Sequence, residues 1–126
     1  MMGKRVVIVD DERDIVEYLI VLLKDNGFEP YTAANSAEGL VLIKRLRPEL
    51  ICLDILMPGQ SGISLFQEIK KDKDLAKIPT IIISGLNLAK ELGEKESALK
   101  DIKPDLYIEK PIAPSVFIEA VRKLLQ

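Results

Sequence analysis

Acidic, hydroxyl and ammonium side chains follow the apolar runs of this chain at four places. They are Asp10 and Asp11 after residues 4–9, Asp54 after 50–53, Ser84 after 80–83 and Lys110 after 105–108. Carboxylate oxygens without nitrogen or sulfur ligands suit a hard cation, above all Mg²⁺. A hydroxyl and an ammonium beside that cation can neutralise a phosphoryl group, and one carboxylate can attack phosphorus to form an acyl phosphate. Singly, such residues are more often helix caps, turn residues or surface charges, so their joint placement carries the hypothesis.

Short, continuous apolar runs predict the strands that would position these residues. The runs before Asp10 and Asp54 leave no room for a polar face, which is typical of strands covered on both sides in a parallel sheet. A proline disfavours a central strand, so Pro30 indicates that the second strand lies at an edge of the sheet. The expected strands are residues 4–9, 28–33, 50–53, 80–83 and 105–108.

Segments with helical spacing separate these strands. The expected helices are residues 12–26, a segment from Ser36 as N-cap to the residue before Pro48, residues 63–74, a weakly patterned segment at 87–101, and a last helix from Pro114. The alternation predicts an α/β fold, a doubly wound five-stranded parallel sheet with five helices. Because parallel strands point the same way, the residues after the strands should gather at one edge of the sheet.

Two helices carry predictions about which side chains are buried. In the first helix, Ile20 and Val21 fall off the main apolar face, so they either pack against the rest of the fold or form part of a partner surface. The last helix is expected to bury Val116, Phe117, Ala120, Val121, Leu124 and Leu125.

Composition excludes several classes of function. The chain has 126 residues, 48% of them hydrophobic, and a net charge of −2, which fits one folded domain without the basic excess of a nucleic-acid-binding protein. There is no histidine, so Ser-His-Asp catalysis and phosphohistidine formation on this chain are excluded. Cys52 lies inside an apolar run and is expected in the core. No apolar run has membrane-spanning or signal-peptide length, and we therefore expect a cytoplasmic protein without membrane contact.

The chain resembles the response-regulator receiver domain of two-component signalling over essentially its whole length. The matching segments are Val9-Asp10-Asp11, residues 54–59 with Gly62, Ser84, and Lys110-Pro111. The resemblance implies one receiver domain over residues 1–126, with a flavodoxin-like fold of strand order 2-1-3-4-5. No output domain is expected within this chain.

The resemblance also implies roles around a bound Mg²⁺. Asp54 would be the phosphoacceptor and a metal ligand. Asp11 would bind Mg²⁺ directly, Asp10 would act beside it through water, and the backbone carbonyl of Leu56 would be a further ligand. Apolar side chains at Leu56 and Leu86 cannot orient an attacking water, which predicts slow self-dephosphorylation.

Three further residues receive roles from the resemblance. Lys110 would pair with the phosphoryl oxygens, and its peptide bond to Pro111 would be cis. Ser84 would bond a phosphoryl oxygen once Asp54 is modified. Tyr107 would turn inward as Ser84 moves, reshaping the face of the fourth helix, the fifth strand and the fifth helix, although an ordinary strand aromatic is the alternative.

The expected function is therefore a phosphoaccepting switch, not an enzyme that turns over an external substrate. The donor would be a sensor histidine kinase or a histidine phosphotransfer protein, the downstream protein target stays unknown, and a phosphorylation-dependent homodimer is compatible with the pattern. A haloacid-dehalogenase-type phosphatase or mutase would need a second Asp at position 56, where the chain has Leu56. A receiver acting only as a binding module is the remaining alternative, and the intact acidic residues and Lys110 argue against it.

Overall fold

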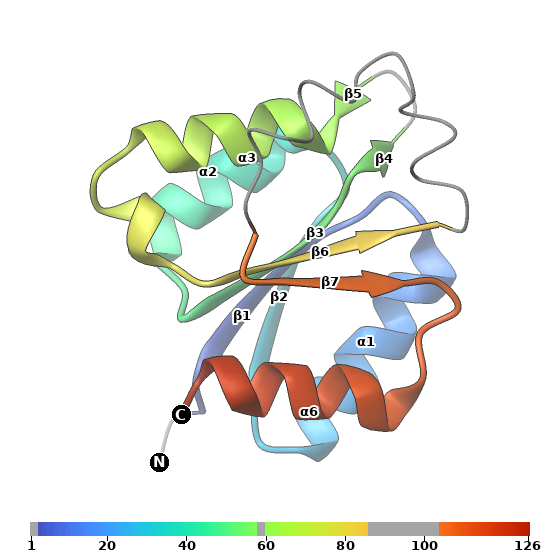
Figure 1. The fold of residues 1–126 in the computed structure, drawn as a ribbon. Coiled ribbons are helices and arrows are strands. Elements are labelled where there is room, and N and C mark those ends of the chain that lie inside the picture. The colour runs from blue at the N-terminus through green and yellow to red at the C-terminus, as the bar shows by residue number, and fades with distance from the viewer. Residues whose placement is uncertain (1–2, 58–59, 86–103) are drawn as a thin grey trace.

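The structure is a computed structural model that describes residues 3–57, 60–85 and 104–126, with only the backbone described at 56, 57, 60 and 61. Its centre is a five-stranded parallel sheet of order β2-β1-β3-β6-β7 (Figure 1). The strands are β1 Arg5–Val9, β2 Glu29–Ala33, β3 Leu50–Asp54, β6 Thr80–Ser84 and β7 Leu106–Glu109. Taken in chain order, these strands have the predicted order 2-1-3-4-5, and the strand that contains Pro30 is at an edge, as expected.

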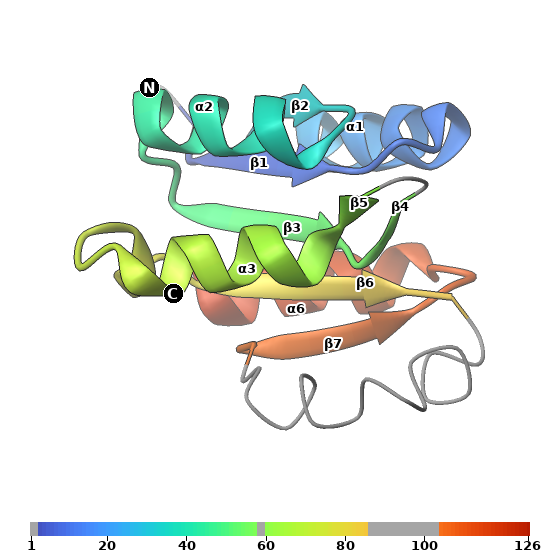
Figure 2. The same ribbon diagram turned by 90° about the horizontal axis from the view of Figure 1, so that it is seen from above.

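Helices cover both faces of this sheet. α1 (Arg13–Asp25) and α6 (Pro114–Leu124) lie on one face, and α2 (Ser36–Leu46) and α3 (Gly62–Lys71) lie on the other (Figure 2). A 3₁₀ turn, η1 (Leu75–Lys77), and a two-residue antiparallel pair, β4 (Leu56–Met57) with β5 (Gln60–Ser61), complete the described elements. The expected helix at 87–101 lies outside the described residues. Within them, no helix has the length and apolar character needed to cross a membrane.

The period of two along β1 divides the core into two clusters. Val6 and Ile8 pack with Leu19 of α1 and Phe117 of α6, whereas Val7 and Val9 face the side of α2 and α3. Every residue of β3 is buried, and so is every residue of β6, which is the pattern predicted for central parallel strands. The thiol of Cys52 is fully buried, and burial raises its pKa to about 12.

Two local predictions are wrong. The N-cap of α2 is Asn35, whose side chain accepts a hydrogen bond from the backbone N–H of Glu38, so Ser36 is the first helical residue. Val116 is 51% exposed in α6, and Ile118 is buried instead. The sheet meets α6 through Phe117 and Val121, which places Ile118 on the buried side and Val116 outside it.

The two residues of α1 that fall off its main apolar face, Ile20 and Val21, have different environments. Ile20 is partly buried and packs against the α1–α6 cluster, so it belongs to the core. Val21 is 55% exposed and stays on the surface.

Candidate functional site

The registers of the sheet bring the predicted residues to one edge. Val9 pairs with Leu53, Asp54 with Ile83, and Ser84 with Glu109, so the strands β1, β3, β6 and β7 end side by side. The backbone N–H of Lys110 donates to the Ser84 carbonyl over 2.7 Å, which extends the pairing of β6 and β7 by one residue. Asp10 therefore follows β1, a direct neighbour of the Asp54 strand, whereas Lys110 follows β7, which is separated from that strand by β6.

Lys110 is the cation of this edge. Its Nζ lies 2.5 Å from Glu12 Oε1, 3.4 Å from Asp54 Oδ2 and 3.6 Å from Asp10 Oδ2. The Lys110 side chain is 15% exposed, and the side chains of Asp10 and Asp54 are 1% exposed. Burial is the largest influence on the Lys110 pKa and lowers it, but the bond to Glu12 and the charges of the aspartates outweigh burial, so the pKa is raised. Lys110 is thus an ammonium held among three carboxylates.

Asp10 has one oxygen with a hydrogen bond and one without. Its Oδ1 accepts from the backbone N–H of Glu12 over 2.9 Å, whereas the buried Oδ2 has no hydrogen-bond partner among the described residues. Burial is the main cause of a raised Asp10 pKa, although that hydrogen bond and the charge of Lys110 lower it. A buried carboxylate oxygen without a donor is chemically suited to a cation ligand.

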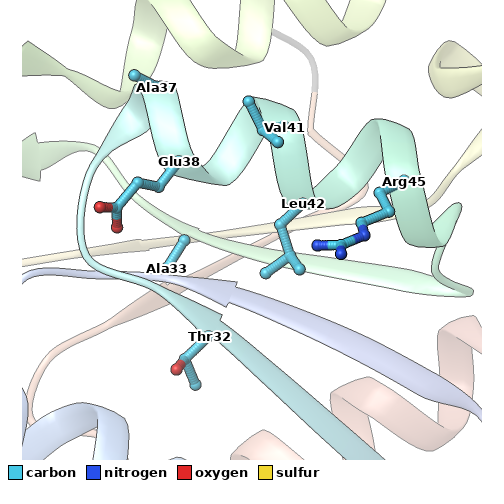
Figure 3. A pocket seen from close by; sticks show the side chains of 7 residues that line it. All are labelled: Thr32, Ala33, Ala37, Glu38, Val41, Leu42 and Arg45. Carbon is cyan, nitrogen blue, oxygen red and sulfur yellow. The ribbon is translucent and has the colours of Figure 1, made fainter.

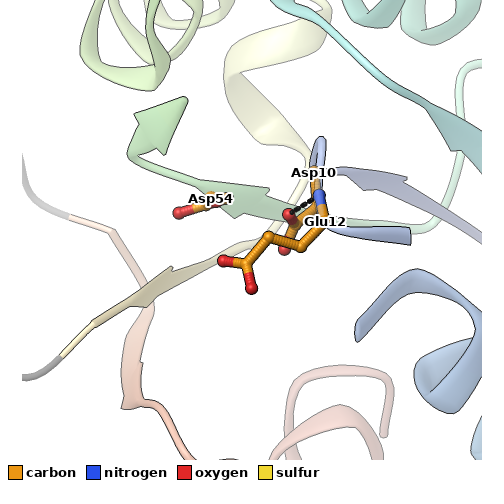
Figure 4. A group of neighbouring side chains, drawn as sticks. All are labelled: Asp10, Glu12 and Asp54. Carbon is orange, nitrogen blue, oxygen red and sulfur yellow. Dashed lines mark hydrogen bonds between the residues drawn. The ribbon is translucent and has the colours of Figure 1, made fainter. Parts of the chain in front are cut away.

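Three carboxylates converge beside Lys110. Asp10, Glu12 and Asp54 each offer one oxygen, and these oxygens lie within 4.8 Å of one another (Figure 4). An all-oxygen group of this kind fits Mg²⁺, a hard cation that usually keeps several waters. The donor set therefore fits the expected metal.

The three aspartates expected as metal ligands do not all lie together. Asp10 and Asp54 belong to the group of three, whereas the side chain of Asp11 is exposed and lies outside that group. Glu12 was not anticipated as a member of the site. The run of three acidic residues directly after β1 was the available signal, because Glu12 precedes α1 at the same edge of the sheet.

A close approach of two backbone segments fixes the loop after Asp54. A Cβ at position 62 would lie 2.2 Å from the carbonyl oxygen of Asp54, so only glycine fits there. The backbone N–H of Gly62 also donates to the Ile55 carbonyl over 3.0 Å, which closes the loop across β4 and β5. Position 56, the expected carbonyl ligand, therefore begins a loop that is tied back to the end of β3.

The residues expected to respond to modification are on β6, on β7 and directly after β7. Ser84 is buried at the end of β6, and the peptide bond between Lys110 and Pro111 is cis. Tyr107 of β7 is 47% exposed, and its partial burial raises the pKa of its hydroxyl. Leu86 and the side chain of Leu56 lie outside the described residues.

Two hollows open on the neighbouring surface. One of about 390 Å³ adjoins the carboxylate group and is lined by residues that include Asp10, Asp11, Arg13 and Thr32. The other, of about 400 Å³, lies between β2 and α2 and is lined by Thr32, Ala33, Ala37, Glu38, Val41, Leu42 and Arg45 (Figure 3). Only the first of these two contains residues of the carboxylate edge.

Comparison with known proteins gives a consistent family match. The profile of the family described as "Response regulator receiver domain" matches residues 6–122. The phosphate regulon transcriptional regulatory protein PhoB of Pseudomonas aeruginosa is 34% identical over 128 residues, which cover 100% of this chain and 53% of that protein. PhoB of Escherichia coli is 28% identical, with 99% and 53% covered. The chain thus spans about half the length of these curated relatives.

Solved structures show the same fold. The chemotaxis protein CheY4 of Vibrio cholerae matches with a TM-score of 0.85 at 23% identity, covering 98% of this chain and 99% of that one. The signal receiver domain of a signal transduction histidine kinase from Syntrophus aciditrophicus also has a TM-score of 0.85, at 28% identity, covering 98% and 90%. NtrX of Brucella abortus, solved with ADP, has a TM-score of 0.83 at 32% identity, covering 98% and 27%.

Proposed function

The chain belongs to the response-regulator receiver domain family, and from that premise we propose that its Asp54 carboxylate accepts a phosphoryl group from a phosphohistidine donor. Receiver domains of this family are signalling switches of two-component systems, not enzymes that turn over external substrates. The observation that carries the proposal for this chain is the buried Asp54 carboxylate, which lies 3.4 Å from the Lys110 ammonium and within 4.8 Å of the carboxylate oxygens of Asp10 and Glu12.

The transfer is a displacement at phosphorus. An Asp54 carboxylate oxygen forms the new O–P bond while the P–N bond of the donor phosphohistidine breaks, and the donor imidazole keeps the electron pair. The donor histidine lies outside this chain, because this chain has no histidine. A sensor histidine kinase or a histidine phosphotransfer protein has the required chemistry.

The acidic residues hold the cation that this transfer needs. We assign Mg²⁺ to Asp10, Asp11, Asp54 and the backbone carbonyl of Leu56. The buried Asp10 Oδ2 supports this assignment, because among the described residues it has an ion pair with Lys110 but no hydrogen-bond partner. When bound, Mg²⁺ supplies positive charge that offsets the growing charge on the phosphoryl oxygens. Glu12 lies close enough to share that role with Asp10 and Asp54.

Lys110 and Ser84 are the groups of this chain that receive the phosphoryl oxygens. The Lys110 ammonium exchanges its contact with the Asp54 carboxylate for a charge-assisted bond to a phosphoryl oxygen. The Ser84 hydroxyl donates to a second oxygen, and the space that its movement leaves is filled by Tyr107 turning inward from its half-exposed position. A local change of charge thereby shifts a two-state surface element near β7 and α6.

The output of the switch is a change in partner binding, and its target is a protein that contacts this surface. The PhoB relatives are transcriptional regulators by name and are about twice as long as this chain. The net charge of −2 is not the basic excess that favours binding to DNA phosphates, so we propose no direct nucleic-acid contact by these residues.

Acetyl phosphate tests the proposal without a cognate kinase. We expect incubation with acetyl phosphate and Mg²⁺ to add one phosphoryl group to the intact mass, and we expect no gain in Asp54→Ala or without Mg²⁺. Asp25→Ala is the matched control, since Asp25 lies at the far end of α1 from the carboxylate group, and it should be modified like the wild type. If neither acetyl phosphate nor beryllofluoride with Mg²⁺ acts on the wild type, the chain is a receiver that functions only as a binding module.

A further inference from the structure

Glu12 reaches across the site instead of capping its own helix. It is the N-cap residue of α1, where the shorter side chains of Ser, Thr, Asp or Asn commonly accept a backbone hydrogen bond, and the longer Glu12 side chain makes no such bond. Its Oε1 lies 2.5 Å from Lys110 Nζ, a residue 98 positions away in the sequence. The side chain of Glu12 is therefore directed by Lys110 and not by the helix.

Among the carboxylate contacts of Lys110 in the described part of the chain, this one is the shortest. The ammonium lies 0.9 Å closer to Glu12 than to Asp54, by the difference between 2.5 Å and 3.4 Å. Glu12 is 55% exposed and Asp54 is 1% exposed, so the ammonium is drawn toward the solvent side of the site. Lys110 has to release its charge-assisted bond to Glu12 before it can bind a phosphoryl oxygen on Asp54.

We propose that Glu12 is a positioning residue that competes with the phosphoryl group on Asp54 for the ammonium of Lys110. This inference rests on the proposed function. In the unmodified protein the Glu12 carboxylate holds Lys110 at the rim of the site. Phosphorylation of Asp54 requires the Lys110 ammonium to leave Glu12 and bind a phosphoryl oxygen. Glu12 therefore weakens the binding of a phosphoryl group and sets how readily the switch is turned on.

The same carboxylate has an opposite effect on the cation. As one of three converging carboxylates, Glu12 contributes negative charge that attracts Mg²⁺, so its removal lowers metal affinity. The two effects separate when the metal site is saturated, because only the competition for Lys110 then remains. The decisive comparison is thus made at saturating Mg²⁺.

The first measurement uses the metal-free protein and reads the freedom of Lys110 directly. A limiting amine-acylating reagent is added at fixed pH, and peptide mass spectrometry gives the rate of acylation at Lys110. Loss of one half-exposed ion pair in Glu12→Gln should raise that rate by about two- to fivefold. The matched control is Glu17→Gln, which removes the same charge from α1 at an ion pair with Arg13 and should leave the rate at Lys110 unchanged.

The second measurement is a beryllofluoride titration at saturating Mg²⁺, since beryllofluoride on Asp54 mimics a phosphoryl group. Glu12→Gln should bind about two- to fivefold more tightly than the wild type, and Glu17→Gln should match the wild type. In a Lys110→Gln background, Glu12→Gln should not tighten beryllofluoride binding, because the ammonium for which Glu12 competes is gone. That loss of coupling would not follow from a merely structural role of Glu12.

Each other result overturns the inference. An unchanged acylation rate in Glu12→Gln would mean that Glu12 does not hold Lys110. Faster acylation of Lys110 combined with weaker beryllofluoride binding would mean that Glu12 assists the phosphoryl site, and equal binding would mean that it does not compete with the phosphoryl group. Absence of beryllofluoride binding in the wild type and in every variant would overturn the proposed function together with the competition, so the two failures are distinguishable.

Discussion

Replacing Asp10 by asparagine should stabilise the metal-free protein. At an effective dielectric constant of 20, two carboxylate oxygens that lie within 4.8 Å of each other repel by at least about 3.5 kcal/mol, and an ammonium at 3.6 Å attracts by about 4.6 kcal/mol. Asp10 has two such carboxylate neighbours, Glu12 and Asp54, and one ammonium, Lys110, so repulsion exceeds attraction by about 2 kcal/mol. Burial of the charge adds to this cost. The asparagine side chain would keep an oxygen that can accept the backbone N–H of Glu12.

The assay is thermal unfolding with and without Mg²⁺. For a domain of this size, about 2 kcal/mol corresponds to a Tm increase of about 6 °C for Asp10→Asn in a metal-chelating buffer at pH 7. Asp11→Asn is the matched control for the metal-free state, since the Asp11 side chain is exposed and outside the group of three. With Mg²⁺ at about one hundred times its Kd, the wild type should gain about 2.7 kcal/mol, and Asp10→Asn should gain less.

The Tm difference between Asp10→Asn and the wild type should depend on pH. The Asp10 pKa is raised above its ordinary value of 3.8 in the folded protein, so the folded state holds the proton more tightly than the unfolded chain. The stability from this protonation is present at low pH and is lost as the pH rises through the raised pKa. The Tm advantage of Asp10→Asn should therefore shrink as the pH falls from 7. A lower metal-free Tm for Asp10→Asn at pH 7 would refute the electrostatic account.

Three further predictions concern the fold that positions the site. Because burial raises the Cys52 pKa to about 12, a thiol reagent at pH 8 should label Cys52 only on unfolding, and labelling of the native protein at the rate of a free thiol would contradict its placement. Phe117→Ala should lower the free energy of unfolding by about 3–5 kcal/mol, whereas Val116→Ala should change it by less than about 0.5 kcal/mol, both measured by urea unfolding. Asn35→Ala should cost about 1 kcal/mol in the same assay and Asn35→Asp much less, and equal costs would argue against the cap.

The alternation of strands and helices could be predicted because the strand patterns are strong, repeated signals. Continuous apolar runs identified β1, β3 and β6, and the parallel arrangement then placed Asp10, Asp54 and Lys110 at one edge. Strand order itself came from the family resemblance. The pattern of residue types thus predicted that Asp10, Asp54 and Lys110 gather, but it missed Glu12 and did not predict how the groups pair.

Side-chain direction could not be read from the sequence. Glu12 stands in a position typical of a helix cap, and only the three-dimensional placement of Lys110 explains why its carboxylate turns away from the helix. The predicted cap of α2 was wrong for a related reason. Asn35 and Ser36 are both good cap residues, and only the observed backbone, which is extended at Asn35, distinguishes them. Val116 shows that a helical stripe of apolar residues can be wider than the surface that covers it.

The most direct test of the central claim is to map the modified residue. After treatment with acetyl phosphate and Mg²⁺, borohydride reduction converts an aspartyl phosphate to homoserine, which peptide mass spectrometry can locate. The account predicts homoserine at position 54 alone, and none in a sample prepared without Mg²⁺. Homoserine at position 10 or 11, or a stable phosphoryl group on a hydroxyl side chain, would contradict it.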